Sequence, residues 1–217
     1  MPLPKAVRRL TPDALRDNPR LRSLALGAGL IPPRTMHAPA EAAVLEELAR
    51  NARVVVEIGV YEGSSALVLI QAMAAGSQLH LIDPFVDESG WALPAGWGAT
   101  ETATKRVVAR AAAARGDGGP EVHWHVERSQ DAGRAWQGGA VDVVFIDGDH
   151  SPAGVREDWD VWHPHVPAGG RVAFHDANGH SPGPSAVVDE LFHGEQPVAG
   201  WTVERAVESL AVVRRDA

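Results

Sequence analysis

Five ionisable side chains follow two strand-like segments of the chain, and their types suit metal binding and proton transfer. They are Asp147, Asp149, His150, His175 and Asp176. The first three come directly after the apolar run 143–146, which is typical of a central parallel strand covered on both faces. The other two follow residues 171–174. Charged groups at the carboxyl ends of such strands lie where open α/β sheets bind their ligands, so we expect one shared site.

Asp147, His175 and Asp176 can hold an octahedral divalent ion, with water or substrate completing the coordination. The carboxylate oxygens favour Mg²⁺, whereas the imidazole leaves Mn²⁺, Fe²⁺ or another first-row ion open. The alternative is that His175 is a neutral residue of the pocket wall, hydrogen-bonded to one of the two aspartates. For Asp149 the alternative is structural, because its carboxylate could cap the helix that begins after it.

A glycine-containing turn follows the first strand pattern, in the segment VVVEIGVYEGSSA. Glu57 lies at the strand end, and Gly59 and Gly63 allow a sharp turn close to a ligand. Ser64 begins a helix whose free N–H groups suit a polar or anionic group. A dinucleotide-binding turn has the pattern G-x-G-x-x-G, but Tyr61 stands in the place of the second glycine. The spacing therefore favours a nucleoside ligand without a pyrophosphate over NAD, and an ordinary strand-to-helix turn is the alternative.

Two further strand ends carry polar residues that suit a nucleoside. The segment QLHLIDPF leads to Asp83, whose carboxylate can accept hydrogen bonds from both ribose hydroxyls. Ser129 and Gln130 follow the next strand and would lie beside an adenine, while Asp131 fits a helix cap. Asp83 could also be a helix cap, but Pro84 disfavours an immediate helix.

Alternating strand and helix patterns must position these residues. Strands are predicted at 53–58, 78–82, 121–126, 141–146 and 171–174. Helices are predicted between them at 64–75, 100–115, 131–136 and 152–163, and before them at 12–26 and 38–51. Such alternation indicates βαβ units, a parallel sheet and right-handed crossovers.

The last segments, WTVERAV and ESLAVVRR, break this alternation and predict an antiparallel hairpin at the sheet edge. We therefore predict a doubly wound, Rossmann-like α/β fold with a seven-stranded, mostly parallel sheet. Residues 39–217 are expected to form the ligand-binding domain, and residues 1–38 an N-terminal helical extension or lid of the same globular unit. In that extension, Arg34, Met36 and His37 could close over the pocket.

The bulk composition excludes several classes of function. The chain has 217 residues, a formal net charge of −8 and a pI near 5.6, so no basic surplus is available for nucleic-acid phosphates. The absence of cysteine excludes disulfides and thiolate metal sites. The start lacks the apolar core of a signal peptide, and no apolar stretch approaches the roughly 18 residues that span a bilayer. We expect a cytoplasmic protein with a small-molecule substrate and no nucleic-acid or membrane partner, and homo-oligomerisation is left open.

The segments EIGVYEG, LIDPF, RSQD, FIDGDH and GGRVAFHD, in this order and at these intervals, resemble class I S-adenosylmethionine-dependent methyltransferases. More narrowly, they are similar to the O-methyltransferase group that includes macrocin and other antibiotic-sugar methyltransferases, with catechol O-methyltransferase as a more distant relative. The resemblance covers about residues 40–176 and is specific as a set. It implies S-adenosylmethionine as the cofactor and a hydroxyl group of a natural product or sugar as the methyl acceptor.

The resemblance also implies a role for each matching residue. It implies that Glu57 and Gly59 contact the methionine part of the cofactor, that Asp83 contacts the ribose, and that Ser129 and Gln130 contact the adenine. The rest of the cofactor pocket would include Gly63, Ser64 and Asp147. The metal ligands of the similar enzymes are an Asp after strand four and an adjacent pair after strand five, which match Asp147, His175 and Asp176. The departures are Tyr61 in the glycine turn and His175 where a carboxylate is usual.

The implied reaction is a single in-line displacement, in which a substrate hydroxyl attacks the methyl carbon of the sulfonium. A metal that binds two neighbouring oxygens would lower the pKa of the hydroxyl and fix the direction of attack. His150 stands where the catechol enzyme has its lysine base, and an imidazole suits general-base catalysis near neutral pH. Asp149 corresponds to the base position of the sugar enzymes, so both are candidates, with His150 preferred.

Three alternatives differ from this interpretation in mechanism or in class. The first is a metal-independent O- or N-methyltransferase with His150 as the base. The second is a non-catalytic protein that binds S-adenosylmethionine, which the cluster of ionisable residues disfavours because ligand binding alone does not require it. The third, an NAD-linked oxidoreductase, is disfavoured by the glycine spacing.

Overall fold

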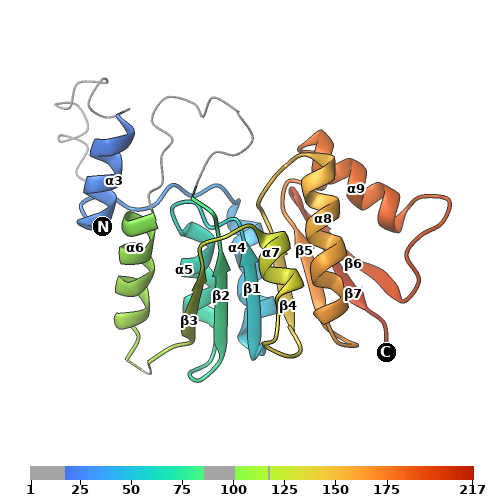
Figure 1. Ribbon diagram of the computed structural model, residues 1–217, viewed down its shortest axis with the longest axis horizontal. Helices are drawn as coiled ribbons and strands as arrows, with labels where there is room; N and C mark the ends of the chain where they lie inside the picture. The colour runs from blue at the N-terminus through green and yellow to red at the C-terminus, as the bar shows by residue number, and fades with distance from the viewer. Residues whose placement is uncertain (1–17, 86–100, 117) are drawn as a thin grey trace.

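The computed structural model describes residues 18–85, 101–116 and 118–217, which fold around one seven-stranded sheet (Figure 1). The strands are β1 Val54–Ile58, β2 Gln78–Ile82, β3 Glu121–His125, β4 Val143–Ile146, β5 Arg171–Phe174, β6 Trp201–Val207 and β7 Leu210–Arg215. Their order is β3-β2-β1-β4-β5-β7-β6, with β1 to β5 parallel and β7 antiparallel to both β5 and β6. The predicted parallel sheet with a C-terminal antiparallel hairpin is confirmed.

Helices cover both faces of the sheet (Figure 1). They are α3 Pro19–Gly27, α4 Pro39–Arg50, α5 Ser64–Ala72, α6 Glu101–Ala113, α7 Ser129–Arg134, α8 Pro152–Trp162, the 3-10 helix η1 His163–His165, and α9 Pro182–Phe192. The core under α4, α5 and α6 includes Leu45 and Leu69. The core under α7, α8 and α9 includes Trp159 and Leu191. This is the predicted doubly wound arrangement.

Strand β4 is apolar throughout because both of its faces are covered. Val143 and Phe145 belong to the core on one face, and Val144 and Ile146 belong to the core on the other. Successive side chains of a strand point to opposite faces of its sheet, and all four of these are buried. The strand therefore carries its polar groups only beyond its carboxyl end.

Helix α9 is absent from the elements that the sequence patterns predict. It begins with the letters PGP, which are typical of a loop, but proline is tolerated in a first helical turn because the N–H it lacks would have no helical partner. The side chains that bury α9 are Val187, Val188 and Leu191. From residue 38 onward, the ends of the predicted elements differ from the observed ends by at most three residues.

The N-terminal segment packs against the rest of the fold through α3 and α6. Arg110 donates from Nη1 to the carbonyl of Gly27 (2.7 Å) and from Nη2 to that of Leu26 (2.8 Å). Asn18 caps α3 by accepting backbone N–H groups, and residues 12–17 of the predicted helix 12–26 lie outside the described residues. Within the described part of the chain, no helix is long and apolar enough to cross a membrane.

Candidate active site

The carboxyl ends of four neighbouring strands each add one backbone hydrogen bond beyond the regular ladder. The bonds run from Asp83 N to His125 O (3.2 Å), Gly59 N to Ile82 O (2.9 Å), Asp147 N to Ile58 O (2.8 Å) and His175 N to Ile146 O (3.0 Å). They align the residues that follow β2, β1, β4 and β5 along one edge of the sheet. The polar residues predicted at these four strand ends are therefore neighbours.

Gly59 lies directly against the backbone of the β4 loop. Its φ is 85°, and a Cβ at this position would lie 2.1 Å from the carbonyl oxygen of Asp147 and 2.8 Å from Cα of Gly148. Only glycine combines this left-handed conformation with so close an approach. The glycine turn and the first ionisable residue after β4 are thus in van der Waals contact.

Asp83 supports the glycine turn from the side of β2. Its Oδ2 accepts the backbone N–H groups of Val60 (2.9 Å) and Tyr61 (2.9 Å), and its Oδ1 accepts that of Phe85 (2.7 Å). Tyr61 has a φ of 51°, so a tyrosine adopts the left-handed conformation that glycine favours. The Asp83 carboxylate is only partly buried and has further acceptor capacity, which a ribose hydroxyl could use.

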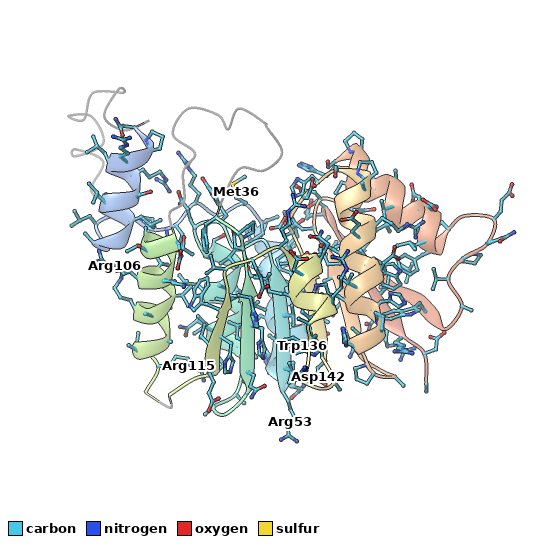
Figure 2. All side chains as sticks on the ribbon, in the orientation of Figure 1. Met36, Arg53, Arg106, Arg115, Trp136 and Asp142 are labelled. Atoms are coloured by element: carbon cyan, nitrogen blue, oxygen red, sulfur yellow. The ribbon has the colours of Figure 1, made fainter. Side chains whose placement is uncertain are left out.

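A buried ion pair, which the sequence patterns do not reveal, ties the glycine turn to the N-terminal segment. Glu62 is 1% exposed and accepts from Arg22 Nε (2.6 Å) and Nη2 (2.5 Å). Arg34 donates its backbone N–H to Glu62 (2.7 Å) and its Nη1 to the hydroxyl of Tyr61 (2.9 Å). Figure 2 shows Met36, from the same segment, over the carboxyl ends of the strands. The segment that carries Arg22 and Arg34 thus contacts the glycine turn.

Glu57 is a fully buried carboxylate at the end of β1. Its Oε1 accepts from the hydroxyl of Ser65, whereas its Oε2 has no hydrogen-bond partner among the described residues. Burial, the largest cause, raises the pKa of Glu57 to about 8, with contributions from the charges of Asp147 and Asp83 and against the hydrogen bond from Ser65. A cationic group close to Glu57 would favour its charged form.

Asp147, His175 and Asp176 come together as predicted, and one candidate ligand atom of each lies within 4.8 Å of the other two. His175 Nδ1 is 3.0 Å from Asp147 Oδ1 and 3.4 Å from Asp176 Oδ1. Although the His175 side chain is only 4% exposed, neither of its ring nitrogens makes a well-directed hydrogen bond to any residue that the structure describes. The three side chains therefore converge on one point, but within the described structure this leaves the ring nitrogens of His175 without a hydrogen bond.

The electrostatics of this cluster favour positive charge. Burial opposes protonation of His175, but Asp147, Asp176 and Glu41 outweigh it and raise the pKa of His175 to about 9. Burial alone would raise the pKa of Asp147, yet the imidazoles of His150 and His175 hold it below its ordinary value. A divalent cation could supply the same positive charge in place of a proton.

The two candidate bases lie in different surroundings. His150 Nε2 is 3.4 Å from Asp147 Oδ1 and His150 Nδ1 is 3.6 Å from Asp176 Oδ2, while the His150 side chain is 44% exposed. Hydrogen bonding to Asp147 is the largest cause that raises the pKa of His150. Asp149 Oδ1 instead accepts the backbone N–H of Ser151 (2.8 Å) at the start of α8. The cap of α8 is Ser151, so Asp149 holds the capping residue and does not cap the helix itself. His150 borders the cluster.

The two residues that are expected beside an adenine contact a carboxylate that the sequence patterns do not single out. Ser129 Oγ and Gln130 Nε2 both donate to Oδ1 of Asp158 on α8, the latter at 2.9 Å. Asp158 is 1% exposed, and burial is the largest cause that raises its pKa to about 7. A Cβ added to Gly148 would lie 3.6 Å from Asp158 Oδ2. This carboxylate therefore adjoins the loop after β4.

Comparison with solved structures finds the same fold in proteins of low sequence identity. The O-methyltransferase TomG from Streptomyces achromogenes, involved in tomaymycin synthesis and solved with S-adenosylmethionine, is 20% identical (TM-score 0.60; 98% of this chain and 95% of that chain covered). An O-methyltransferase from Bacillus cereus in complex with S-adenosylhomocysteine is 16% identical (TM-score 0.56; 97% and 96% covered). An rRNA methylase from Streptococcus thermophilus is 11% identical (TM-score 0.56; 85% and 100% covered). Identities this low show the fold alone and set no substrate.

The sequence itself matches one family over its central part. A family model described as a methyltransferase domain matches residues 56–177, which is more than half of the 217 residues. The match begins within β1 and runs through β5, and it includes the cluster at the strand ends. No curated protein matches the sequence significantly. The chain therefore belongs to the methyltransferase-domain family, and it is an S-adenosylmethionine-dependent methyltransferase.

Proposed function

We propose that this enzyme transfers the methyl group of S-adenosylmethionine to a hydroxyl group of a small molecule, assisted by a divalent cation. The observation that carries the proposal is the contact of Gly59 with Asp147, which joins the glycine turn to the cluster of Asp147, His175 and Asp176. A cofactor held by the turn and a hydroxyl held at the cluster would lie side by side, as in-line transfer requires. Two similar structures are O-methyltransferases, which agrees with a hydroxyl acceptor, and a natural product or sugar stays the acceptor class that the sequence resemblance implies.

The donor set of the cluster fits a divalent cation. Two carboxylates and one imidazole suit Mg²⁺ or Mn²⁺, and the buried ring nitrogens of His175 lack the hydrogen bonds that would otherwise occupy them. We propose Asp147, Asp176 and Nδ1 of His175 as the ligands. When bound, the cation would lower the pKa of a coordinated hydroxyl and orient it.

The protein's own residues would hold the cofactor and move the proton. His150 borders the cluster with an exposed imidazole. It can take the proton of the attacking hydroxyl as the new C–O bond forms and the methyl–sulfur bond breaks, which leaves S-adenosylhomocysteine. Asp147 and Asp176, both near His150, would stabilise the imidazolium that results. The unpaired Oε2 of Glu57 suits the cationic amino group of the methionine part, and Asp83 suits the ribose.

Cofactor binding gives the first test, by thermal unfolding. S-adenosylhomocysteine at 100 times its Kd should raise the Tm of the wild type by about 5–10 °C, because such binding adds about 2.7 kcal/mol of stability. Asp83→Ala should remove most of this shift, since the ribose loses its acceptor. A shift with NAD and none with S-adenosylhomocysteine would overturn the proposed cofactor.

Asp142→Ala is the matched control for this loss. Asp142 also accepts two backbone N–H groups, those of Arg53 (2.7 Å) and Val54 (3.0 Å). It lies just before β4, at the amino ends of the parallel strands and away from the cluster (Figure 2). Its replacement should lower the Tm of the free protein and leave the cofactor-induced shift intact. Equal loss of the shift in both variants would mean that Asp83→Ala acts through a general loss of stability and not through a lost contact with the ribose.

Removal of metal gives the second test. Treatment with EDTA should lower turnover by about 10²-fold or more, because a Lewis-acid cation contributes several kcal/mol to such a transition state. Added Mg²⁺ or Mn²⁺ should restore turnover, while the Tm shift with S-adenosylhomocysteine persists in EDTA. Full turnover in EDTA would instead support metal-independent transfer with His150 as the base.

A further inference from the structure

Behind the cluster lies a second buried carboxylate, which comes from α4. Glu41 is 2% exposed and accepts the backbone N–H of Ala38 at Oε2 (2.6 Å). Its Oε1 accepts both the backbone N–H (2.8 Å) and the hydroxyl (2.6 Å) of Ser209, in the turn between β6 and β7. Three donors thus hold this carboxylate in one place and favour its charged form.

Glu41 faces the nitrogen of His175 that is turned away from the cluster. Glu41 Oε2 is 3.4 Å from His175 Nε2, and the other ring nitrogen, Nδ1, faces Asp147 at 3.0 Å and Asp176 at 3.4 Å. The imidazole is therefore enclosed between one carboxylate on its outer side and two on its inner side. Histidines that bind metals commonly donate their second ring N–H to a carboxylate, which fixes the tautomer and the ring orientation.

We propose that Glu41 is a positioning residue for the metal site, which holds His175 with its proton on Nε2 so that the lone pair of Nδ1 is directed at the cation. This inference rests on the proposed metal-assisted function. It pairs His175, the departure from an all-carboxylate ligand set, with Glu41, because a histidine ligand has a second ring N–H for an outer carboxylate to accept, whereas an ionised aspartate has no such donor. Glu41 touches neither substrate nor cofactor in this arrangement.

The test is a titration with Mn²⁺, followed by the electron paramagnetic resonance signal of the free ion, in the presence of saturating S-adenosylhomocysteine. Glu41→Gln should raise the Kd for Mn²⁺ by about 10- to 100-fold, the usual effect of losing such a partner. Glu46→Gln is the matched control, because Glu46 lies on the same helix but pairs with exposed Arg50. Its Kd should stay within about twofold of the wild type.

A second variant distinguishes a purely structural role of Glu41 from the positioning of His175. Ser209→Ala removes a hydrogen bond from Glu41 but leaves the charge that faces His175, so it should lower the Tm and leave the Kd for Mn²⁺ nearly unchanged. If Glu41→Gln does not fold, Glu41→Asp replaces it, since the shorter side chain keeps its charge but withdraws from His175 and should also weaken binding. A Tm shift with S-adenosylhomocysteine verifies that each variant is folded.

The outcomes distinguish this inference from the function on which it rests. If the wild type binds Mn²⁺ and the Glu41 variants bind it equally well, the positioning role is overturned and the metal site stands. If Ser209→Ala weakens Mn²⁺ binding as much as Glu41→Gln does, Glu41 acts only through the fold. If the wild type binds no Mn²⁺, the metal-assisted function fails and the positioning role fails with it.

Discussion

Replacing His150 with alanine is expected to lower kcat by about 10²- to 10⁴-fold, the range that a positioned general base contributes. The His150 imidazole lies 3.4 Å from Asp147 and 3.6 Å from Asp176, so it can reach a hydroxyl bound at the cluster. The affinity for S-adenosylhomocysteine should change by less than about twofold, because the charged partners of His150 are Asp147 and Asp176 and not residues of the glycine turn.

Steady-state turnover and calorimetric cofactor binding measure these two effects separately. His193→Ala is the matched control, since this histidine at the end of α9 is exposed and pairs with Asp189 on the same helix. The kcat of this variant should equal that of the wild type. Asp149→Asn should retain most of the turnover, because the carboxylate is engaged by the N–H of Ser151. An unchanged rate in His150→Ala with a collapsed rate in Asp149→Asn would transfer the base role to Asp149.

Gly59→Ala should abolish the cofactor-induced rise in Tm and should also lower the Tm of the free protein. Two effects combine at this position. A left-handed φ of 85° costs an alanine about 1–2 kcal/mol, and the new Cβ would lie 2.1 Å from the carbonyl oxygen of Asp147. Because the clash involves backbone on both sides, the β1 and β4 loops must move apart, which separates the cofactor turn from the cluster.

Gly76→Ala isolates the first effect, the cost of the backbone conformation, from the clash. Gly76 has a φ of 77°, yet a Cβ there would meet no atom within 4 Å. This control should lose only the stability that the backbone conformation costs, and it should keep the full Tm shift with S-adenosylhomocysteine. If Gly59→Ala keeps that shift as well, close contact between the two loops is unnecessary for cofactor binding.

The parts of the fold that local patterns encode could be predicted from the sequence. The apolar run of β4 and the residues at the strand ends are enough to bring Asp147, His175 and Asp176 together, because parallel strands end at a common edge. The hairpin of β6 and β7 has strand patterns close together in the chain. By contrast, α9 begins with turn-forming residues. Its few apolar side chains indicate a helix only when the sheet face against which they pack is known.

The partners of the site residues could not be predicted, for a different reason. Glu41 contacts Ser209 at a separation of 168 residues, and Glu62 contacts Arg22 at a separation of 40. Asp158 meets Gln130 from another helix. In each case a charged residue on a helix or loop has the appearance of an ordinary surface residue, because nothing near it in the chain indicates its burial. Only the packing of distant elements gives these carboxylates their partners.

The ion pair between Glu62 and Arg22 limits how this enzyme can be recombined with its relatives. A chimera whose crossover falls between residues 38 and 60 would take Arg22 and Arg34 from one parent and Glu62 from the other. Unless both parents share the pair, the hybrid would bury an uncompensated carboxylate, which typically costs about 3–5 kcal/mol. The N-terminal segment and the glycine turn must therefore come from the same parent, although Arg22 and Glu62 are 40 residues apart along the chain.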